Sequence, residues 1–398
     1  MKHSQFSLFR RFLAFVWIIT IILSVFPASA EPASLEESVT GCFRRRQTSG
    51  GMLLIAKDGE IVFEFCYGFA DKNAKEYVSP DTYFKIASVS KLVTAVSVMK
   101  LVETGRLNLD ENIGHYLGAP SFEAANPYYP KISLTARILM THTSGIIDGK
   151  GAFSLHKPLH ETLNPKKNKA KSGFNQQKPG TKYAYSNFGA GILGSVLEVA
   201  TGKRLTDAAR ELLFDSMEID AAYDAHLVGD PSKIVTTYKA DGSIMKTRSY
   251  RLNKETYDPE IDPDTDYDES YGDLWIRGRD LCRIGIMLCD LGVIDGQRFL
   301  EENTVLEMIS SQKDKGGVKV DSPYGLNVER VKSLIDGKLI YGHQGMSEGV
   351  LCNLYFDPET RFVFALLTNG CDTTARQNRI CTLTRQLFAL AWSAYVEE

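Results

Sequence analysis

Strand patterns lie at both ends of this sequence, and helix patterns lie between them. Residues 51–70 form two apolar runs around a Lys-Asp-Gly-Glu turn, which predicts a β-hairpin. Three more strands are predicted near the other end, at 338–343, 349–356 and 361–368. We therefore expect a mixed α/β fold of the α+β type. An antiparallel sheet built from both chain ends would be flanked by helices, with a mainly helical region inserted at roughly 105–300.

The middle of the chain carries the helix signals. The first predicted helix, 88–104, ends at Gly105, a residue type common after helices. Further helices are predicted at 187–201, 205–216, 273–291, 300–312 and about 373–395. The segment 148–182 is polar and rich in Lys, Gly, Pro and Asn, so we expect a long surface loop there.

The first 30 residues have the three-part pattern of a secretory signal peptide. Three basic residues precede the uncharged run 12–26, and Ala28-Ser29-Ala30 follows as a cleavage site. An uncleaved membrane anchor is the alternative, but this run is short for a span. We expect cleavage after Ala30 and an exported protein, periplasmic or secreted, with 31–398 as one domain. No stable membrane span is expected after cleavage.

Charge and cysteine content narrow the partners. The chain has a net charge of −3. The first 30 residues hold three basic and no acidic residues, so their removal leaves −6. A mildly acidic chain without a basic stripe is a poor nucleic-acid binder. Seven cysteines are an odd number, so at least one is unpaired or intermolecular. No Cys-x-x-Cys spacing indicates zinc or redox chemistry. We expect mostly buried thiols and at most one or two disulfides, whose pairing the sequence leaves open.

The predicted helix 88–104 begins with Ser-Val-Ser-Lys. Ser-x-x-Lys occurs five times in the chain, so the spacing alone carries little weight. On a helical wheel, however, Ser88 and Lys91 lie on the apolar side. The opposite, polar arc comprises Ser90, Thr94, Ser97, Lys100 and Thr104. Burial lowers the pKa of a lysine, and a neutral amine can accept the proton of a serine hydroxyl. The alternative is a wet helix end from which Lys91 reaches solvent.

A second serine motif competes with the first. Residues 345–349, Gly-Met-Ser-Glu-Gly, match the G-x-S-x-G turn of α/β-hydrolases. That fold requires a histidine after the serine, but His343, the last histidine of the chain, precedes Ser347. Strand signals rather than a helix follow it. We therefore reject this match and expect its glycines to allow a close backbone approach in a strand.

Two further motifs accompany Ser88 at a distance. Tyr185-Ser186-Asn187 lies within PGTKYAYSNFG, and His343-Gln344-Gly345 lies in the C-terminal strand region. Together with Ser88-Val89-Ser90-Lys91, and in this order, they resemble the serine β-lactamase-like superfamily. The resemblance is to its branch of class C β-lactamases, D-alanyl-D-alanine peptidases and esterases, and covers roughly 42–395. The segments ILMTHTSGI and LNLDENIGHYL also resemble loops of that family.

The resemblance implies an acyl-serine hydrolase that needs no metal or organic cofactor. Ser88 would attack a carbonyl group and form an acyl-enzyme, while Lys91 and Tyr185 move its proton. A phenol near a lysine ammonium can have a lowered pKa. Asn187 would bind Lys91 and the substrate amide, or cap a helix, or both.

The strand motif would complete the site. His343 would line the cleft, and the backbone N–H groups of Ser88 and Met346 would form the oxyanion hole. The substrate-binding residues implied by the resemblance are Asn187, His343, Gln344, Gly345 and Met346.

The third motif also departs from part of the family. Penicillin-hydrolysing relatives carry Lys and then Thr, which help to hold the carboxylate of the drug, where this chain has His343 and Gln344. His-x-Gly is frequent in the family's peptidases and esterases. We therefore expect small-molecule or peptide acyl substrates, namely D-amino-acid peptides or small esters. The alternatives are a true β-lactamase or penicillin-binding D-Ala-D-Ala carboxypeptidase, and a non-catalytic binding or sensor protein. The oligomeric state stays open.

An acidic stretch adds one alternative for metal binding. Four aspartates occupy alternate positions between 262 and 268, and clustered carboxylates can bind calcium. The glycine expected at the sixth position of an EF-hand loop is replaced by Tyr267. We therefore favour a solvated acidic loop.

Overall fold

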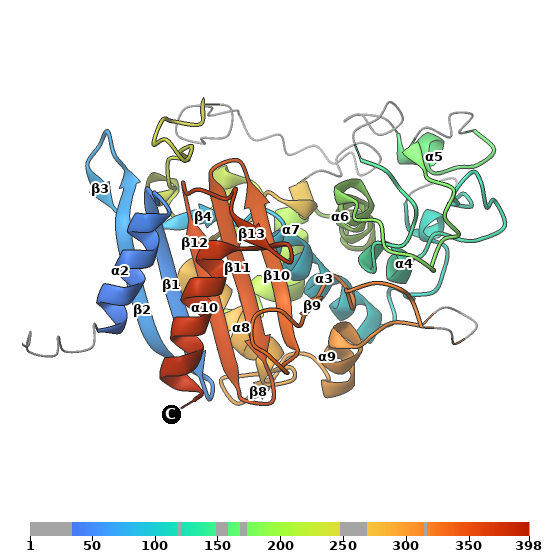
Figure 1. Cartoon of the computed structure of the whole chain (residues 1–398). Coiled ribbons are helices and arrows are strands. Elements are labelled where there is room, and N and C mark those ends of the chain that lie inside the picture. Colours follow the sequence, from blue (N-terminus) through green and yellow to red (C-terminus); the bar gives the residue numbers. More distant parts are fainter. Residues whose placement is uncertain are drawn as a thin grey trace, which may run out of the picture.

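The computed structural model describes residues 34–117, 121–148, 158–167, 173–246, 269–313, 317 and 319–397. An antiparallel sheet of seven strands dominates it, in the order β3-β2-β1-β12-β11-β10-β9 (Figure 1). Its strands are β1 (Gly50–Lys57), β2 (Glu60–Asp71), β3 (Glu76–Tyr77), β9 (Glu329–Val331), β10 (Ile340–Ser347), β11 (Val350–Asp357) and β12 (Phe362–Thr368).

The sheet joins the two ends of the chain. Strand β1 pairs antiparallel with β12, so that Leu54 lies opposite Ala365. The N-terminal hairpin β1–β2 and the C-terminal hairpin β11–β12 thus share one sheet. The predicted architecture is confirmed, because both sets of strand signals contribute to the same antiparallel sheet.

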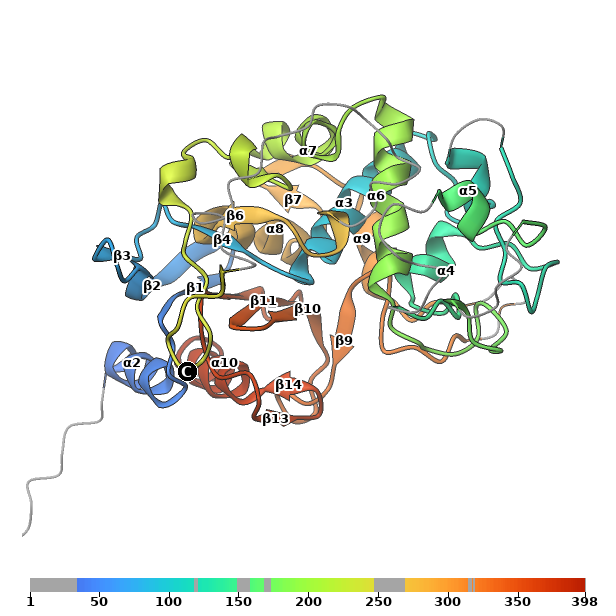
Figure 2. The same ribbon diagram turned by 90° about the horizontal axis from the view of Figure 1, so that it is seen from above.

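Helices cover both faces of this sheet. Helices α2 (Leu35–Arg45) and α10 (Thr382–Tyr395) lie on one face, and α8 (Gly278–Cys289) packs against β1, β11 and β12 on the other (Figure 2). Because side chains alternate along a strand, Leu53 and Ile55 join the core under α2 and α10, whereas Met52 and Leu54 join the larger core on the α8 side.

Helix α3 (Val89–Glu103) lies inside that larger core. It contacts β10 on one side and α6 (Asn187–Thr201) on another. Most of the predicted polar arc does not face solvent, since Ser90, Thr94 and Ser97 are all buried. Thr94 Oγ1, for example, hydrogen-bonds the hydroxyl of Tyr223 at 2.7 Å. Lys100 is half-buried, and Thr104, at the end of the helix, is exposed. The buried part of the arc is covered because the inserted region packs on the side of α3 that the sheet leaves open.

The inserted region is irregular between its helices. It includes α4 (Ala136–Met140), α5 (Leu159–Thr162), α7 (Leu205–Ala209), a π-helical turn Arg210–Phe214 and short 3₁₀ turns such as Glu269–Tyr271. A second sheet of three strands has the order β4-β6-β5, with β4 at Tyr83–Lys85, β5 at Ala221–Ala222 and β6 at Trp275–Arg277.

Several predicted boundaries are wrong. The helix expected at 273–291 begins as strand β6, because Trp275 and Ile276 pair with β4. The helix expected from 373 starts only at Thr382, after the hairpin β13–β14 (Arg376–Gln377, Ile380–Cys381). The helix expected at 300–312 is the shorter α9 (Glu302–Ile309).

The expected surface loop 148–182 is also partly wrong, since Leu159, Leu163 and Phe174 are buried.

All seven cysteines lie in the described part of the chain and are free thiols; six of them are buried. The remaining hairpin is β7–β8 (Val293–Ile294, Gln297–Arg298). No helix within the described ranges is long and apolar enough to cross a membrane. The predicted signal peptide, residues 1–30, lies outside the described residues.

Candidate active site

Ser88 lies at the N-terminus of α3, on a tight turn. Ala87 adopts a left-handed backbone conformation with φ of +47°, which is uncommon for a residue with a side chain. Ser88 occupies the cap position but makes no capping hydrogen bond. Its Oγ instead accepts a hydrogen bond from Lys91 Nζ at 3.0 Å. The Ser88 hydroxyl therefore binds the Lys91 side chain instead of capping the helix.

Lys91 is buried one turn into α3. Its side chain has no exposed surface, so the wet-end alternative is excluded. Besides Ser88, Nζ donates to the backbone carbonyl of Tyr271 at 2.7 Å. Burial lowers the pKa of Lys91 to about 7, against the opposing charges of Asp148 and Asp273. A substantial fraction of this amine is therefore neutral near pH 7 and can accept a proton.

Tyr185 approaches Ser88 from the segment before α6. Lys91 Nζ lies 5.2 Å from the centre of its ring. Burial raises the pKa of Tyr185, while a hydrogen bond with Ser88 opposes that rise. The predicted lowering by the lysine charge is therefore wrong, because desolvation of the phenolate outweighs the favourable contacts. Tyr185 stays protonated near neutral pH.

Asn187 is the first residue of α6. The cap is the preceding residue, Ser186, whose Oγ accepts a hydrogen bond from the backbone N–H of Gly189 at 2.9 Å. The alternative of Asn187 as the helix cap is therefore wrong. Its backbone N–H donates to Asp148 Oδ2 at 2.7 Å. Between the described side chains of Asn187 and Lys91 the structure shows no hydrogen bond.

Gly345 brings strand β10 against the start of α3. A Cβ atom at this position would overlap the carbonyl oxygen of Ile86 and lie 3.1 Å from the backbone nitrogen of Ser88. Only glycine permits this approach. The predicted close backbone contact is present, and it places the backbone before Met346 beside Ser88.

His343 faces the same side of β10 as Gly345, two residues away. It is buried, and its Nδ1 lies 2.8 Å from the backbone carbonyl oxygen of Gln344, so Nδ1 carries the proton. Burial, together with the positive charge of Lys91, lowers the pKa of His343 to about 3. His343 is therefore a neutral wall of the site at neutral pH.

The sequence matches the family model described as "Beta-lactamase" over residues 32–383. The chain belongs to the Beta-lactamase family. This confirms the prediction of a serine hydrolase related to β-lactamases. Ser88, Lys91 and Tyr185 lie together at the start of α3 beside strand β10, and their role as catalytic residues stays a prediction.

Individual relatives are distant. Penicillin-binding protein 4 of Amycolatopsis lactamdurans is 29% identical over 81% of this chain and 81% of its own length. Esterase EstB of Burkholderia gladioli is 29% identical over 47% of this chain and 50% of its own length, so that match spans about half of each protein. The D-amino acid amidase of Ochrobactrum anthropi SV3 has a similar structure, with a TM-score of 0.65, 20% identity and coverage of 92% and 100%.

Gln344 and Met346 point to the opposite face of β10 from His343. Gln344 Nε2 donates to the backbone carbonyl of Arg379 at 3.0 Å, and its Oε1 accepts from the backbone N–H of Cys381 at 3.0 Å. Met346 Sδ contacts Cys381 Sγ at 3.1 Å. Both side chains therefore pack toward Cys381 at the start of α10.

Sequence reasoning missed two residues that support Tyr185. His142, in the ILMTHTSGI segment, is buried, and its ring centre lies 4.3 Å from that of Tyr185. Its Nδ1 accepts the backbone N–H of Ser186 at 3.3 Å. Tyr324 packs against His142 and His343, with ring centres 5.0 and 5.5 Å away. The only sequence signal for His142 was its place in a family loop, and Tyr324 had none.

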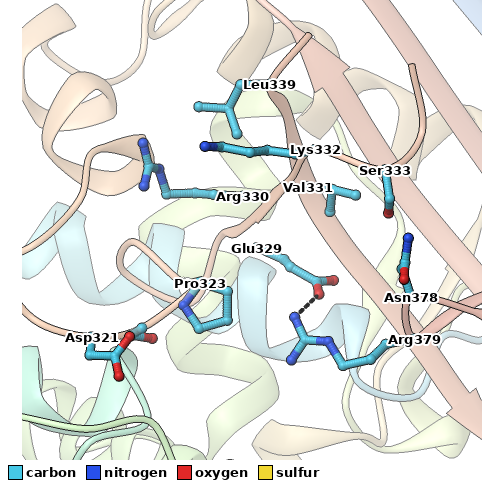
Figure 3. Close-up of a pocket in the computed structure, with 11 residues that line it drawn as sticks. Asp321, Pro323, Glu329, Arg330, Val331, Lys332, Ser333, Leu339, Asn378 and Arg379 are labelled. Atoms are coloured by element: carbon cyan, nitrogen blue, oxygen red, sulfur yellow. Dashed lines mark hydrogen bonds and ion pairs between the residues drawn. The ribbon is translucent and has the colours of Figure 1, made fainter. Parts of the chain in front are cut away.

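A pocket lies beside β9, and none of the predicted site residues is among those that line it. Its volume is about 560 Å³, and its lining includes the cations Arg330, Lys332 and Arg379 (Figure 3). Arg379 forms an ion pair with Glu329 at 3.1 Å, drawn as a dashed line in Figure 3, and donates to the hydroxyl of Tyr183 at 3.3 Å. Arg379 thus connects the lining of this pocket with Tyr183, which precedes Tyr185 by two residues.

The remaining candidates do not add to the site. Ser347 ends strand β10 and leads into the hairpin to β11, which is not the strand-to-helix turn of an α/β-hydrolase. Among the described residues, no group of three His, Cys, Asp or Glu side chains could hold a metal ion. The acidic stretch 262–268 lies outside the described residues.

Proposed function

We propose that this chain is an exported serine hydrolase that forms an acyl-enzyme at Ser88 with amide or ester substrates. The observation that carries the proposal is the hydrogen bond of 3.0 Å between Ser88 Oγ and the fully buried Lys91 Nζ. A buried amine with a pKa of about 7 is suited to deprotonating a hydroxyl at neutral pH. Export rests on the signal pattern of residues 1–30.

The proposed acylation step uses the groups in distinct roles. Ser88 Oγ bonds to the substrate carbonyl carbon while its proton passes to Lys91 Nζ. The carbonyl oxygen becomes an oxyanion, which the backbone N–H groups of Ser88 and Met346 would stabilise. When the C–N or C–O bond breaks, the leaving group takes a proton from Lys91, with Tyr185 as a protonated relay beside Ser88. Water then attacks the acyl-enzyme and releases the acid.

The substrate class is proposed as D-amino-acid peptides and amides or small esters. The names of the similar proteins, an esterase and a D-amino acid amidase among them, are compatible with both kinds of acyl group. His343 is neutral at pH 7, so the third motif lacks the cation that helps penicillin-hydrolysing relatives to hold a carboxylate. Asn187, His343 and Gly345 would line the acyl site.

A penicillin-binding carboxypeptidase or true β-lactamase is the second candidate, favoured by the similarity to penicillin-binding protein 4 over most of both chains. A panel of p-nitrophenyl esters, D-amino-acid amides and nitrocefin, each run beside Ser88→Ala, separates the two. We expect turnover of an ester or D-amide that Ser88→Ala abolishes. Fast nitrocefin hydrolysis without esterase or amidase activity would overturn the proposed substrate class.

A non-catalytic protein with the same fold is the rival from another class. It predicts that the wild type takes no fluorophosphonate or fluorescent penicillin label and turns over no acyl substrate. The presence of Ser88, Lys91 and Tyr185 in mutual contact argues against it, because a binding protein has no need of a buried lysine at a serine hydroxyl.

A further inference from the structure

Asp148 accepts hydrogen bonds from three consecutive residues next to Tyr185. Its Oδ1 accepts from Ser186 Oγ at 2.7 Å and from the backbone N–H of Phe188 at 3.2 Å. Its Oδ2 accepts from the backbone N–H of Asn187 at 2.7 Å. One carboxylate therefore holds the start of α6, immediately after the catalytic tyrosine.

A carboxylate at a helix N-terminus is common and in itself structural, because it satisfies free N–H groups and complements the helix dipole. Here the capping role is already filled by Ser186, whose Oγ accepts from Gly189. What sets Asp148 apart is its neighbourhood. Ser88 acts on the pKa of Tyr185, and Lys91 Nζ, which donates to Ser88, lies 5.2 Å from the centre of the Tyr185 ring, so the segment that Asp148 holds adjoins Ser88.

Asp148 also acts on the charge balance of Lys91. The titratable groups that face Lys91 are Tyr185, Tyr271, His142, His343, Asp148 and Asp273. Burial lowers the pKa of both histidines, so they are neutral at pH 7. The two aspartates supply the negative charges that oppose the desolvation of Lys91.

We propose that Asp148 is a positioning residue for acylation: it fixes the Tyr185–Asn187 segment against Ser88 and sets a negative charge near the Lys91 ammonium. This inference rests on the proposed function, because it assumes Ser88 as nucleophile and Lys91 as base. It goes beyond the proposed function because one side chain, Asp148, governs both the position of Tyr185 and the protonation of Lys91.

Asp148→Asn tests both parts. The amide nitrogen of the new side chain would face an N–H donor of the α6 terminus, so the segment must shift, and the charge is lost. We expect the maximal rate of fluorophosphonate labelling of Ser88 to fall about 10- to 100-fold, as expected for a small misplacement of catalytic groups. The labelling rate of the wild type should fall toward low pH as Lys91 becomes protonated, and we call this part of the pH–rate curve the acid limb. In Asp148→Asn its midpoint should move to lower pH, because the pKa of Lys91 falls further.

Asp273→Asn separates charge from position. Asp273 pairs with Lys85 at 2.6 Å and makes no hydrogen bond to residues 186–188. Its loss should shift the acid limb in the same direction, with a smaller loss of maximal rate than in Asp148→Asn.

Asp230→Asn is the matched control. Asp230 accepts from the side chain and backbone of Ser232 at 2.6 and 3.0 Å in an exposed turn, the same kind of contact remote from Ser88. It should leave both readouts at wild-type values. Thermal unfolding checks that each variant folds.

Asp148→Glu, which keeps the charge but moves it, is the second variant, and we expect a lower maximal rate with a midpoint near that of the wild type.

The outcomes are distinguishable. A maximal rate for Asp148→Asn within about twofold of the wild type overturns the positioning role, and an unchanged midpoint overturns the charge role. If the wild type takes no label at Ser88, the proposed function fails instead. The pKa of Lys91 can then be read directly by NMR titration of ¹³C-lysine-labelled protein. If the pKa of Lys91 is equal in the wild type and in Asp148→Asn, this inference is overturned, and that test does not require an active enzyme.

Discussion

Helix α3 and the segment before α6 each bring a titratable side chain to Ser88, but burial acts on the two groups in opposite directions. Lys91 is charged when protonated, so desolvation lowers its pKa to about 7. Tyr185 is charged when deprotonated, so desolvation raises its pKa. The same dry surroundings therefore favour the lysine as the base and the tyrosine as the donor. The contrast assigns roles to two residues that the motif alone leaves equivalent.

Replacing the base should have the largest effect. We expect Lys91→Met to lower the acylation rate by about 10²- to 10⁴-fold, the usual contribution of a general base. Single-turnover labelling of Ser88 measures this rate. Lys100→Met, in the last turn of the same helix, is the matched control and should keep wild-type rates. A Lys91→Met variant that acylates normally would assign the base to another group.

Removing the hydroxyl of Tyr185 should reduce the acylation rate less than replacing Lys91. Tyr185→Phe keeps the ring but loses the hydroxyl, and we expect the acylation rate to fall about 10- to 100-fold, the worth of one hydrogen bond to a developing charge. Tyr77→Phe, at an exposed tyrosine of edge strand β3, is the control. If Tyr185→Phe proves more damaging than Lys91→Met under identical assay conditions, the two roles are reversed.

The sequence could predict the sheet and the helix that follows Ser88 because the strands and helices depend on local periodicity. The strand signals at both ends predicted one shared sheet, although not which strands pair. The helical wheel placed Lys91 among valines, although it left a wet helix end open as the alternative. The closed environment of α3 could not be predicted, since Ser90, Thr94 and Ser97 are covered by residues distant in sequence. The position of Asp148 was hidden for the same reason: it lies 38 residues before the Ser186 hydroxyl that it binds.

The side-chain direction of Gln344 shows a different limit of prediction from the sequence. A motif names residues but not the face of the strand that each occupies. The alternation along β10 sends His343 and Gly345 toward α3, and Gln344 and Met346 toward α10. The reversal of the predicted Tyr185 shift has a related cause, because the sequence showed the neighbouring charge but not the extent of desolvation.

Stability should respond to Lys91 in the opposite sense from activity. Burying the charged lysine lowers the free energy of unfolding, and this destabilisation is at its full size below pH 7. It decreases as the pH rises from about 7 toward 10.5, the pKa of an exposed lysine. We therefore expect Lys91→Met to gain about 1–2 kcal/mol of stability at pH 6 and less at pH 10. Urea unfolding at both pH values measures this. A destabilised variant at pH 6 would show that the lysine contacts outweigh its desolvation.

The smallest effect on activity is expected at Gln344, whose side chain faces away from Ser88. Gln344→Ala leaves the N–H of Cys381 and the carbonyl of Arg379 without their partner, which should cost about 1 kcal/mol of stability. Acylation should stay within about threefold of the wild type. Chemical unfolding and single-turnover labelling report the two quantities. A rate loss above tenfold with unchanged stability would place the Gln344 side chain in the substrate site.

The pH dependence of Ser88 labelling tests the central claim most directly. If neutral Lys91 activates Ser88, the rate of fluorophosphonate labelling should fall as the pH decreases, with a midpoint near 7, the pKa of the buried amine. Mass spectrometry should locate the label on Ser88, and Ser88→Ala should take none. A labelling rate that is flat between pH 5 and pH 9, or a label that persists in Ser88→Ala, would contradict the account.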